Sequence, residues 1–230
     1  MRLLHISDNH GYFESIDDYE FDVIVASGDF FRNYSNTPNY NKQSIREEYE
    51  KQTNWFNKNS DAVKSWAKNK PIIFCSGNHD YFNGNNEWFI NCTNKLIEFN
   101  GYRIYGFPYV PYHVGRWNFE TKPQEAFEKA SRAFKQHGMV DVVVTHCPPH
   151  GTLDYHRDHG YYGSAAVAYL IGLMQPAIVL CGHVHSGYGT IEKQGIRYSN
   201  AAIGDNPLEL KPRLFNLERE DSSVRTTLIV

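Results

Sequence analysis

The amino-acid sequence predicts an α/β fold, with strands and helices packed as a sandwich in a single domain over residues 1–230. Short apolar runs rich in β-branched residues recur along the chain, and segments with helical spacing lie between them. Further strand-like pieces follow residue 187. A chain of 230 residues fits one sizeable domain, and its 41% of hydrophobic residues are enough to fill a core.

Five apolar runs are typical of buried strands, because each is short and is followed at once by polar residues, Gly or Pro. They are residues 3–6, 23–26, 72–75, 140–145 and 178–181. The later pieces, residues 196–199, 213–217 and 224–230, alternate like strands. We expect these three to form a second sheet.

Helical spacing predicts helices over residues 47–67, 123–137 and 164–174. For the first helix, the predicted inner face consists of Tyr49, Trp55, Phe56, Val63 and Trp66. Residues 30–44, rich in Asn and Tyr, have neither periodicity nor apolar content. They form either a mobile surface loop or a lid over a site.

Charge and composition disfavour several classes of protein. The formal net charge of −3 provides no global field for gathering polyanions, so no stable nucleic-acid partner is expected. No apolar run approaches the roughly 20 residues of a membrane span, and the polar start does not resemble a signal peptide. We therefore expect a cytoplasmic protein that does not bind membranes. The four cysteines lack CxxC spacing, which predicts buried free thiols.

Polar side chains follow all five predicted buried strands, at the point where each strand ends. Each segment alone has an ordinary explanation, such as a turn or a helix cap. Together they do not, because the carboxyl ends of strands are where α/β folds bind ligands. We expect these side chains to converge: Asp8 and His10, Asp29, Asn78 with His79 and Asp80, His146, and His183 with His185.

The composition of this set points to metal ions. Without His79 and Asp80 it holds two Asp, one Asn and four His, seven donors that are all oxygen or nitrogen. One four- or six-coordinate ion could not use seven comfortably, whereas two ions sharing a bridging carboxylate could. Two cations about 3.5–4 Å apart form a clamp for in-line displacement at phosphorus. Such donors suit Mn²⁺, Fe²⁺ or Fe³⁺, Zn²⁺ or Ni²⁺, so the two ions stay unidentified.

In their order along the chain, these segments resemble the signature of the calcineurin-like metallophosphoesterases. The resemblance implies a four-layer α/β/β/α sandwich with two mixed sheets. It implies a first metal held by Asp8, His10, Asp29 and His185, and a second held by Asp29, Asn78, His146 and His183. His79 matches the non-ligand histidine that protonates the leaving oxygen, and Asp80 would orient and charge that imidazole.

A finer resemblance lies in residues 145–154 and 182–189, which are similar to the small phosphodiesterases that include the animal metallophosphoesterase-domain proteins. It implies hydrolysis of a small or nucleotide phosphodiester, including cyclic nucleotides, by a metal-bridging hydroxide with His79 as general acid. The Asp-Arg pair of the protein phosphatases is missing after Asp29. Arg32 either reaches the substrate or stays at the surface. Asn78 and His150 are further candidates for substrate binding. His150 either lines the substrate pocket or lies in a surface loop.

Two other functions stay open on the sequence. One is a nuclease or nucleic-acid end-processing enzyme, against which the mildly acidic balance argues. The other is a non-catalytic metal-binding interaction module, against which the retained ligands and His79 argue. The sequence leaves the oligomeric state and the natural substrate open.

Overall fold

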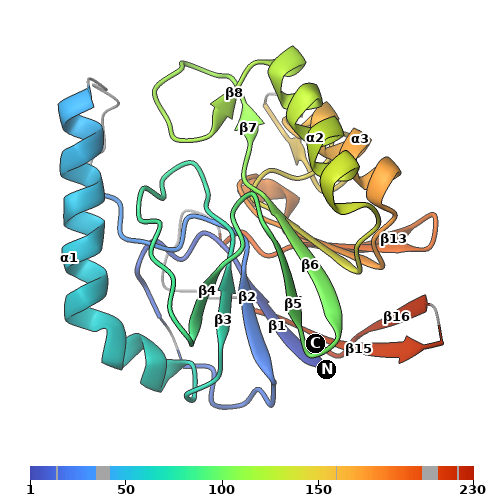
Figure 1. The fold of residues 1–230 in the computed structure, drawn as a ribbon, viewed down its shortest axis with the longest axis horizontal. Helices are drawn as coiled ribbons and strands as arrows, with labels where there is room; N and C mark the ends of the chain where they lie inside the picture. Colours follow the sequence, from blue (N-terminus) through green and yellow to red (C-terminus); the bar gives the residue numbers. More distant parts are fainter. Residues whose placement is uncertain (14, 35–41, 159, 204–211, 222) are drawn as a thin grey trace.

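The computed structural model describes residues 1–13, 15–34, 42–158, 160–203, 212–221 and 223–230. Two six-stranded sheets form its centre, in the orders β16-β15-β1-β2-β3-β4 and β13-β14-β12-β9-β6-β5. Helix α1 (Lys42–Trp66) covers the outer face of the first sheet, while α2 (Pro123–His137) and α3 (Ala165–Met174) cover that of the second (Figure 1). The predicted four-layer sandwich with two mixed sheets is confirmed.

Each sheet combines parallel strands with antiparallel additions, at one edge of the first sheet and at both edges of the second. In the first, β1 (Arg2–Ile6), β2 (Val23–Ala26), β3 (Ile72–Phe74) and β4 (Phe89–Asn91) run parallel, and β15 (Arg213–Glu220) and β16 (Ser223–Leu228) are antiparallel additions. In the second, the parallel strands are β6 (Tyr102–Phe107), β9 (Val142–Thr145), β12 (Ile178–Cys181) and β14 (Ile196–Asn200). Its edges are β5 (Leu96–Phe99) and β13 (Gly189–Lys193).

Alternation along the strands explains the layers. Leu4 and Ile6 of β1 pack toward α1, whereas Leu3 packs between the two sheets. In β9, Val142 lies between the sheets and Val143 faces α2 and α3. The interior strands β2, β3 and β12 are apolar on both faces, as expected when helices cover a parallel sheet. No helix within the described ranges is both long and apolar enough to cross a membrane.

The expectation that the three late strands form a sheet of their own is wrong. β14 joins the second sheet, whereas β15 and β16 extend the first sheet beside β1. The reason is burial: Phe215 and Leu217 of β15 pack between the sheets with Leu3. Strands β4, β5 and β6, which the sequence did not indicate, lie between β3 and α2 in the order of the chain.

The first helix also differs from the prediction. It starts at Lys42, and Tyr49 is exposed rather than on the inner face. Glu48 and Gln52 are buried with Phe56 and Val63, because loops lie over this part of the helix and their backbone groups hydrogen-bond to these two polar side chains. Phe30 and Phe31, at the start of the Asn- and Tyr-rich stretch, are fully buried core residues. Whether this stretch is a lid or a surface loop depends on residues 35–41, which lie outside the described ranges.

One polar contact joins the two sheets inside their apolar interface. His5 of β1 is fully buried; its Nδ1 lies 2.9 Å from the hydroxyl of Ser199 in β14, and its Nε2 lies 2.9 Å from that of Ser27 after β2. Burial lowers the pKa of His5 from 6.5 to about 3, despite the opposing charge of Asp8. The imidazole is therefore neutral in the folded protein near neutral pH.

The substitution His5→Gln should change how stability depends on pH. Because the pKa of His5 is lowered to about 3 by burial, the unfolded state binds a proton that the folded state does not. The free energy of unfolding therefore falls below about pH 6.5, by about 1.4 kcal/mol between about pH 7.5 and 5.5. Urea unfolding of the metal-free proteins should show that the wild type loses this much more than His5→Gln. Equal losses would contradict a buried neutral His5.

Candidate metal centre

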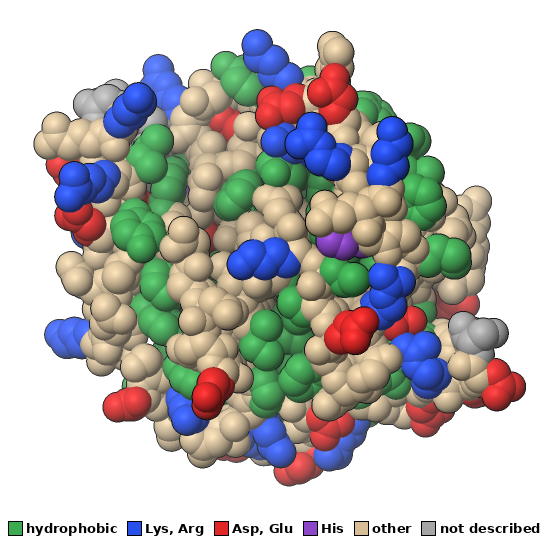
Figure 2. Space-filling model, viewed as in Figure 1, with side chains coloured by type: hydrophobic (Ala, Val, Ile, Leu, Met, Phe, Trp, Pro, Cys, Tyr) green, Lys and Arg blue, Asp and Glu red, His purple; other side chains and the backbone are tan. Residues whose placement is uncertain are grey.

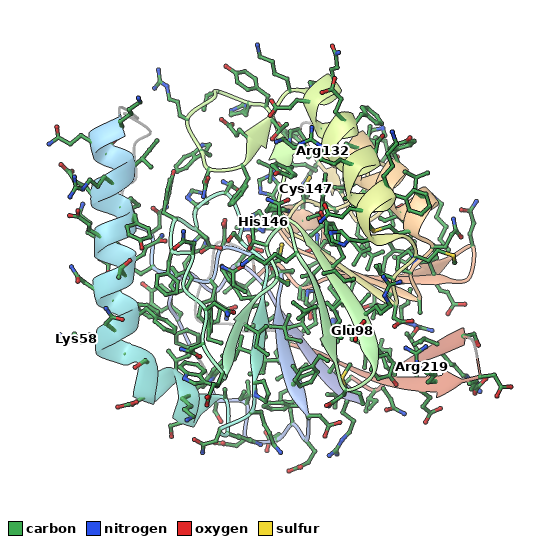
Figure 3. All side chains as sticks on the ribbon, in the orientation of Figure 1. Lys58, Glu98, Arg132, His146, Cys147 and Arg219 are labelled. Carbon is green, nitrogen blue, oxygen red and sulfur yellow. The ribbon has the colours of Figure 1, made fainter. Side chains whose placement is uncertain are left out.

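The polar segments predicted from the sequence meet where strands of both sheets end. β1, β2 and β3 bring their loops from the first sheet, and β9 and β12 bring theirs from the second. His146, which follows β9, lies near the middle of the molecule between α1 on one side and α2 and α3 on the other (Figure 3). Ligand atoms of Asp8, His10 and Asp29 all lie within 4.8 Å of one another.

Asp8 joins the loops after β1 and β12. Its Oδ2 accepts hydrogen bonds from the Ser7 hydroxyl at 2.7 Å and from the backbone N–H of His183 at 3.0 Å. Its Oδ1 lies 3.5 Å from Nε2 of His185. Burial alone would raise the pKa of Asp8, but the contact with His185 and the charge of His146 outweigh it and lower the pKa to about 2. Asp8 is therefore ionised, as a metal ligand must be.

Asp29 lies at the centre of the cluster and is 3% exposed. Its Oδ2 is 3.3 Å from Nε2 of His146 and 3.9 Å from Nε2 of both His10 and His79. Its Oδ1 accepts the backbone N–H of His79 at 2.8 Å. Burial would raise the pKa of Asp29, yet the neighbouring His146 and His79 hold it well below its usual range. One carboxylate thus faces donors that come from three loops.

The donors around His146 fit a cation. Its Nδ1 donates to the carbonyl oxygen of Ser27 at 3.0 Å, since a carbonyl only accepts. Its Nε2 then faces two oxygens, Oδ1 of Asn78 at 3.0 Å and Oδ2 of Asp29 at 3.3 Å. With Nδ1 donating, Nε2 of a neutral ring carries a lone pair. This lone pair would repel those on the oxygens of Asn78 and Asp29 unless a proton or a metal ion lay among the three atoms. Burial lowers the pKa of His146, but Asp29 outweighs it and raises the pKa to about 9, so the site favours positive charge here.

Two further histidines lie at the same centre. The ring of His183 lies 4.9 Å from that of His146, and burial together with the charge of His146 lowers the pKa of His183 to about 4. Nδ1 of His10 is buried and has no hydrogen-bond partner among the described residues. The structure thus brings together all seven residues to which the sequence assigned metal ligation.

Backbone strain accompanies this convergence. Asp8, His10, Asp29 and His183 have φ angles of 58°, 47°, 50° and 66°, in the left-handed region that L-residues rarely adopt. Such conformations cost on the order of 1–3 kcal/mol each and concentrate at functional sites. Gly77 allows a close approach as well, because a Cβ at this position would overlap the carboxylate of Asp29.

Buried polar side chains hold the turn that carries Asn78 and His79. Gln52 of α1 donates to the carbonyl oxygen of His79 at 2.7 Å and accepts the N–H groups of Tyr81 and Phe82 at 2.7 and 3.0 Å. From the other side, the backbone N–H of Asn118 donates to the carbonyl oxygen of Asn78 at 3.1 Å. The turn is therefore fixed at both flanks.

Asp80 does not contact the imidazole of His79, contrary to the expectation from the sequence. Its carboxylate accepts the backbone N–H groups of Phe30, Phe31 and Gly77, at 3.3, 3.1 and 2.8 Å. Burial and the charge of Asp29 raise the pKa of Asp80 to about 6. Asp80 thus joins the loop after β2 to the turn after β3, since these amides have no strand to pair with.

Asn33 occupies the position expected of Asp80. Its Nδ2 lies 3.0 Å from Nδ1 of His79. Because an amide NH₂ group can only donate, Nδ1 of His79 accepts this hydrogen bond. The sequence carried no signal for this pair, since the two residues lie 46 positions apart and Asn33 stands in a stretch without periodicity.

Arg32 and His150 are not brought to the cluster. Arg32 is exposed, and its guanidinium lies 5.7 Å from the ring centroid of Tyr34. Nδ1 of His150 lies 3.6 Å from Asp154, and its ring contacts Tyr161. His150 lines a pocket with α3 and β13 that contains none of the seven candidate ligands. The structure therefore favours the surface position for Arg32 and the loop position for His150.

A comparison with known families matches residues 1–187 to the calcineurin-like phosphoesterases. The chain belongs to this family. Its members typically bind a dinuclear divalent metal centre, and the cluster around Asp29 is the candidate for that centre here. A metal-dependent phosphoester hydrolase, as expected from the sequence, is thereby supported at the level of the family.

Relatives share parts of the chain. Human metallophosphoesterase domain-containing protein 1 is 29% identical over 118 residues, which cover 49% of this chain and 35% of the human protein. A UPF0046 protein of Caenorhabditis elegans is 23% identical over 241 aligned positions, covering 97% of this chain and 77% of its own. Among solved structures, a dimetal phosphatase from Danio rerio has a TM-score of 0.54 and 10% identity, covering 100% of this chain and 99% of its own. This last similarity shows the fold.

The substitution Gly77→Ala should weaken metal binding, because the added Cβ displaces the carboxylate of Asp29. At Mn²⁺ concentrations of about 100 times Kd, metal should raise the melting temperature of the wild type by about 5–10 °C. We expect Gly77→Ala to lose most of this increase and most of its metal, measured by thermal unfolding and elemental analysis.

Gly172→Ala is the matched control, since Gly172 lies in α3 and a Cβ there meets nothing within 4 Å. It should keep the metal response and gain about 0.5–1 kcal/mol of stability from helix propensity. A folded Gly77→Ala protein with full metal content would show that Asp29 is not a ligand.

Proposed function

We propose that this protein is a phosphodiesterase that hydrolyses a small or nucleotide phosphodiester at a centre of two divalent metal ions. The observation that carries the proposal is the convergence, around the buried Asp29, of six further oxygen and nitrogen donors from the ends of strands in both sheets. Family membership supports the reaction class. The chain spans about a third of the length of the human relative, so the proposed substrate class is argued from the site itself.

The chain's own residues would divide between two ions. In the division that the family resemblance implies, Asp8, His10 and His185 would share one ion with Asp29, and Asn78, His146 and His183 would share the other; the contacts of His185 with Asp8 and of His146 with Asn78 and His183 support it. When bound, two cations of Mn²⁺, iron, Zn²⁺ or Ni²⁺ would activate water and neutralise charge on the phosphoryl oxygens. Asp8 and Asp29, both held ionised, would carry the negative charge that retains them.

His79 is placed to donate a proton. Its Nδ1 accepts from Asn33, so the hydrogen of the neutral ring is on Nε2. Nε2 is also the ring atom that faces the cluster, 3.9 Å from Oδ2 of Asp29. In the protonated ring Nε2 carries a hydrogen as well. His79 therefore points an N–H group at the centre in either state, and its protonated ring would give this proton to the leaving oxygen and become neutral.

The charges near the centre favour a diester over a monoester. A phosphate monoester carries a second negative charge, which protein phosphatases bind with an arginine side chain. Here Arg32 lies over Tyr34, and no Lys or Arg lines the pocket beside Asn78, His79 and His183 within the described part of the chain. Positive and negative side chains are interspersed on the face shown in Figure 2, which offers no basic track for a nucleic acid.

The substitution His79→Ala should separate proton donation from metal binding. With a 2′,3′-cyclic nucleotide, whose leaving group is an alkoxide, we expect kcat to fall by about 10²–10⁴. With bis(4-nitrophenyl) phosphate the fall should be smaller, because nitrophenolate leaves without a proton. Metal content, measured by elemental analysis, should stay near that of the wild type, unlike in Asp29→Asn.

His137→Ala, at the end of α2, is the control and should keep both activities. An equal loss on both substrates would contradict the acid role of His79. A 4-nitrophenyl monoester and a plasmid complete the panel, and preference for either would replace the proposed substrate class.

A further inference from the structure

A pocket of about 370 Å³ opens beside the candidate metal centre. We call it the aromatic pocket, and its lining includes Tyr112, Trp117 and Tyr162 together with Asn78, His79 and His183. Its volume lies in the range of about 300–1,000 Å³ that is usual for small-molecule sites. It combines an aromatic wall with three residues of the centre, so a ligand in it would lie next to a phosphoryl group bound at that centre.

Tyr112 and Trp117 of the aromatic pocket belong to a fixed loop, and Tyr162 follows β11 (Gly160–Tyr161). The loop joins β7 (Val110–Pro111) to β8 (Glu120–Thr121), which pair with each other. The carboxylate of Glu120 accepts four backbone N–H groups of this loop, at 2.6 to 3.2 Å, from His113, Val114, Arg116 and Trp117. The pocket is therefore formed without a ligand, which reduces the entropy that binding would cost.

The loop is also tied to the reacting end of the site. Asn118 hydrogen-bonds to the backbone of Asn78 and Asp80, on both sides of His79. The ring centroid of Trp117 lies 4.2 Å from that of His79. The aromatic wall and the proton donor thus hold fixed positions relative to each other, so the wall can position a substrate and not merely cover the site.

We propose that the aromatic pocket binds a planar aromatic ring of the substrate, such as the base of a nucleotide. This inference rests on the proposed phosphodiesterase function. Aromatic side chains favour a flat ring over a saturated group of equal size, because stacked and edge-to-face contacts add to the burial of area. A second phosphate group is disfavoured, since the lining within the described residues includes no Lys or Arg.

The test compares two inert ligands that differ in one ring. Benzylphosphonate and cyclohexylmethylphosphonate carry the same head group, and their rings are of similar size. Calorimetry with the manganese-loaded protein should give a Kd about 2- to 10-fold lower for benzylphosphonate. Tyr112→Leu and Tyr162→Leu should each reduce that ratio toward one. Trp117 is left intact, because its contact with His79 would confuse the result.

Tyr169→Leu is the matched control, because Tyr169 in α3 is 41% exposed, as is Tyr162, and lies outside the pocket. It should keep the preference for the aromatic ring. Equal affinity for the two phosphonates, a preference unchanged in both pocket variants, or binding of inorganic phosphate without binding of benzylphosphonate would each overturn the proposal.

The calorimetric measurement needs no turnover, so its failure is distinguishable from that of the proposed function. An intact ring preference without hydrolysis of any diester would support the ring site and overturn the phosphodiesterase. Hydrolysis of diesters without a ring preference would support the phosphodiesterase and overturn the ring site.

Discussion

The buried carboxylate of Asp29 is the group on which the arrangement of the site depends. A charge so far from water costs several kcal/mol unless opposite charge compensates it. Nitrogen atoms of His10, His79 and His146 therefore face one of its oxygens, from three separate loops. None of these loops could satisfy Asp29 alone. The strained backbone at Asp29 and Asp8 is retained because the surrounding contacts fix it.

This requirement links the centre to the packing of the two sheets. Asp29 follows a strand of the first sheet, and His146 follows a strand of the second, so the distance between them depends on how the sheets pack. Buried polar side chains interrupt their otherwise apolar interface: the hydroxyl of Tyr102 donates to the carbonyl oxygen of Leu217, and His5 contacts Ser27 on one side and Ser199 on the other. The carbonyl oxygen of Ser27 also accepts from His146. Ser27 thus takes part both in joining the sheets and in orienting His146, a candidate metal ligand.

Local patterns predicted the ends of the strands and hence the candidate ligands, because a buried strand followed by polar residues is visible within ten positions. Partners across the fold are not visible in this way. Alternation marked β15 as a strand, but its place beside β1 depends on Phe215 and Leu217 packing against Leu3. Gln52 and Asn118 support the turn around His79 from a helix and a distant loop. Their amides resemble any surface amide in the sequence.

The same limit explains the error over Asp80. A carboxylate next to a histidine in the sequence suggests a pair, yet adjacent residues of a tight turn point apart. Asp80 instead accepts backbone amides of the loop that carries Asp29, and Asn33 from that loop contacts His79. An amide differs from a carboxylate here in a way that bears on catalysis. A carboxylate can only accept, so it would keep a hydrogen on Nδ1 of the ring in both charge states. An amide instead offers its NH₂ group to the Nδ1 lone pair of the neutral ring and, after rotation, its oxygen to Nδ1–H of the protonated ring. Asn33 can therefore hold His79 in one orientation whether or not its ring is protonated.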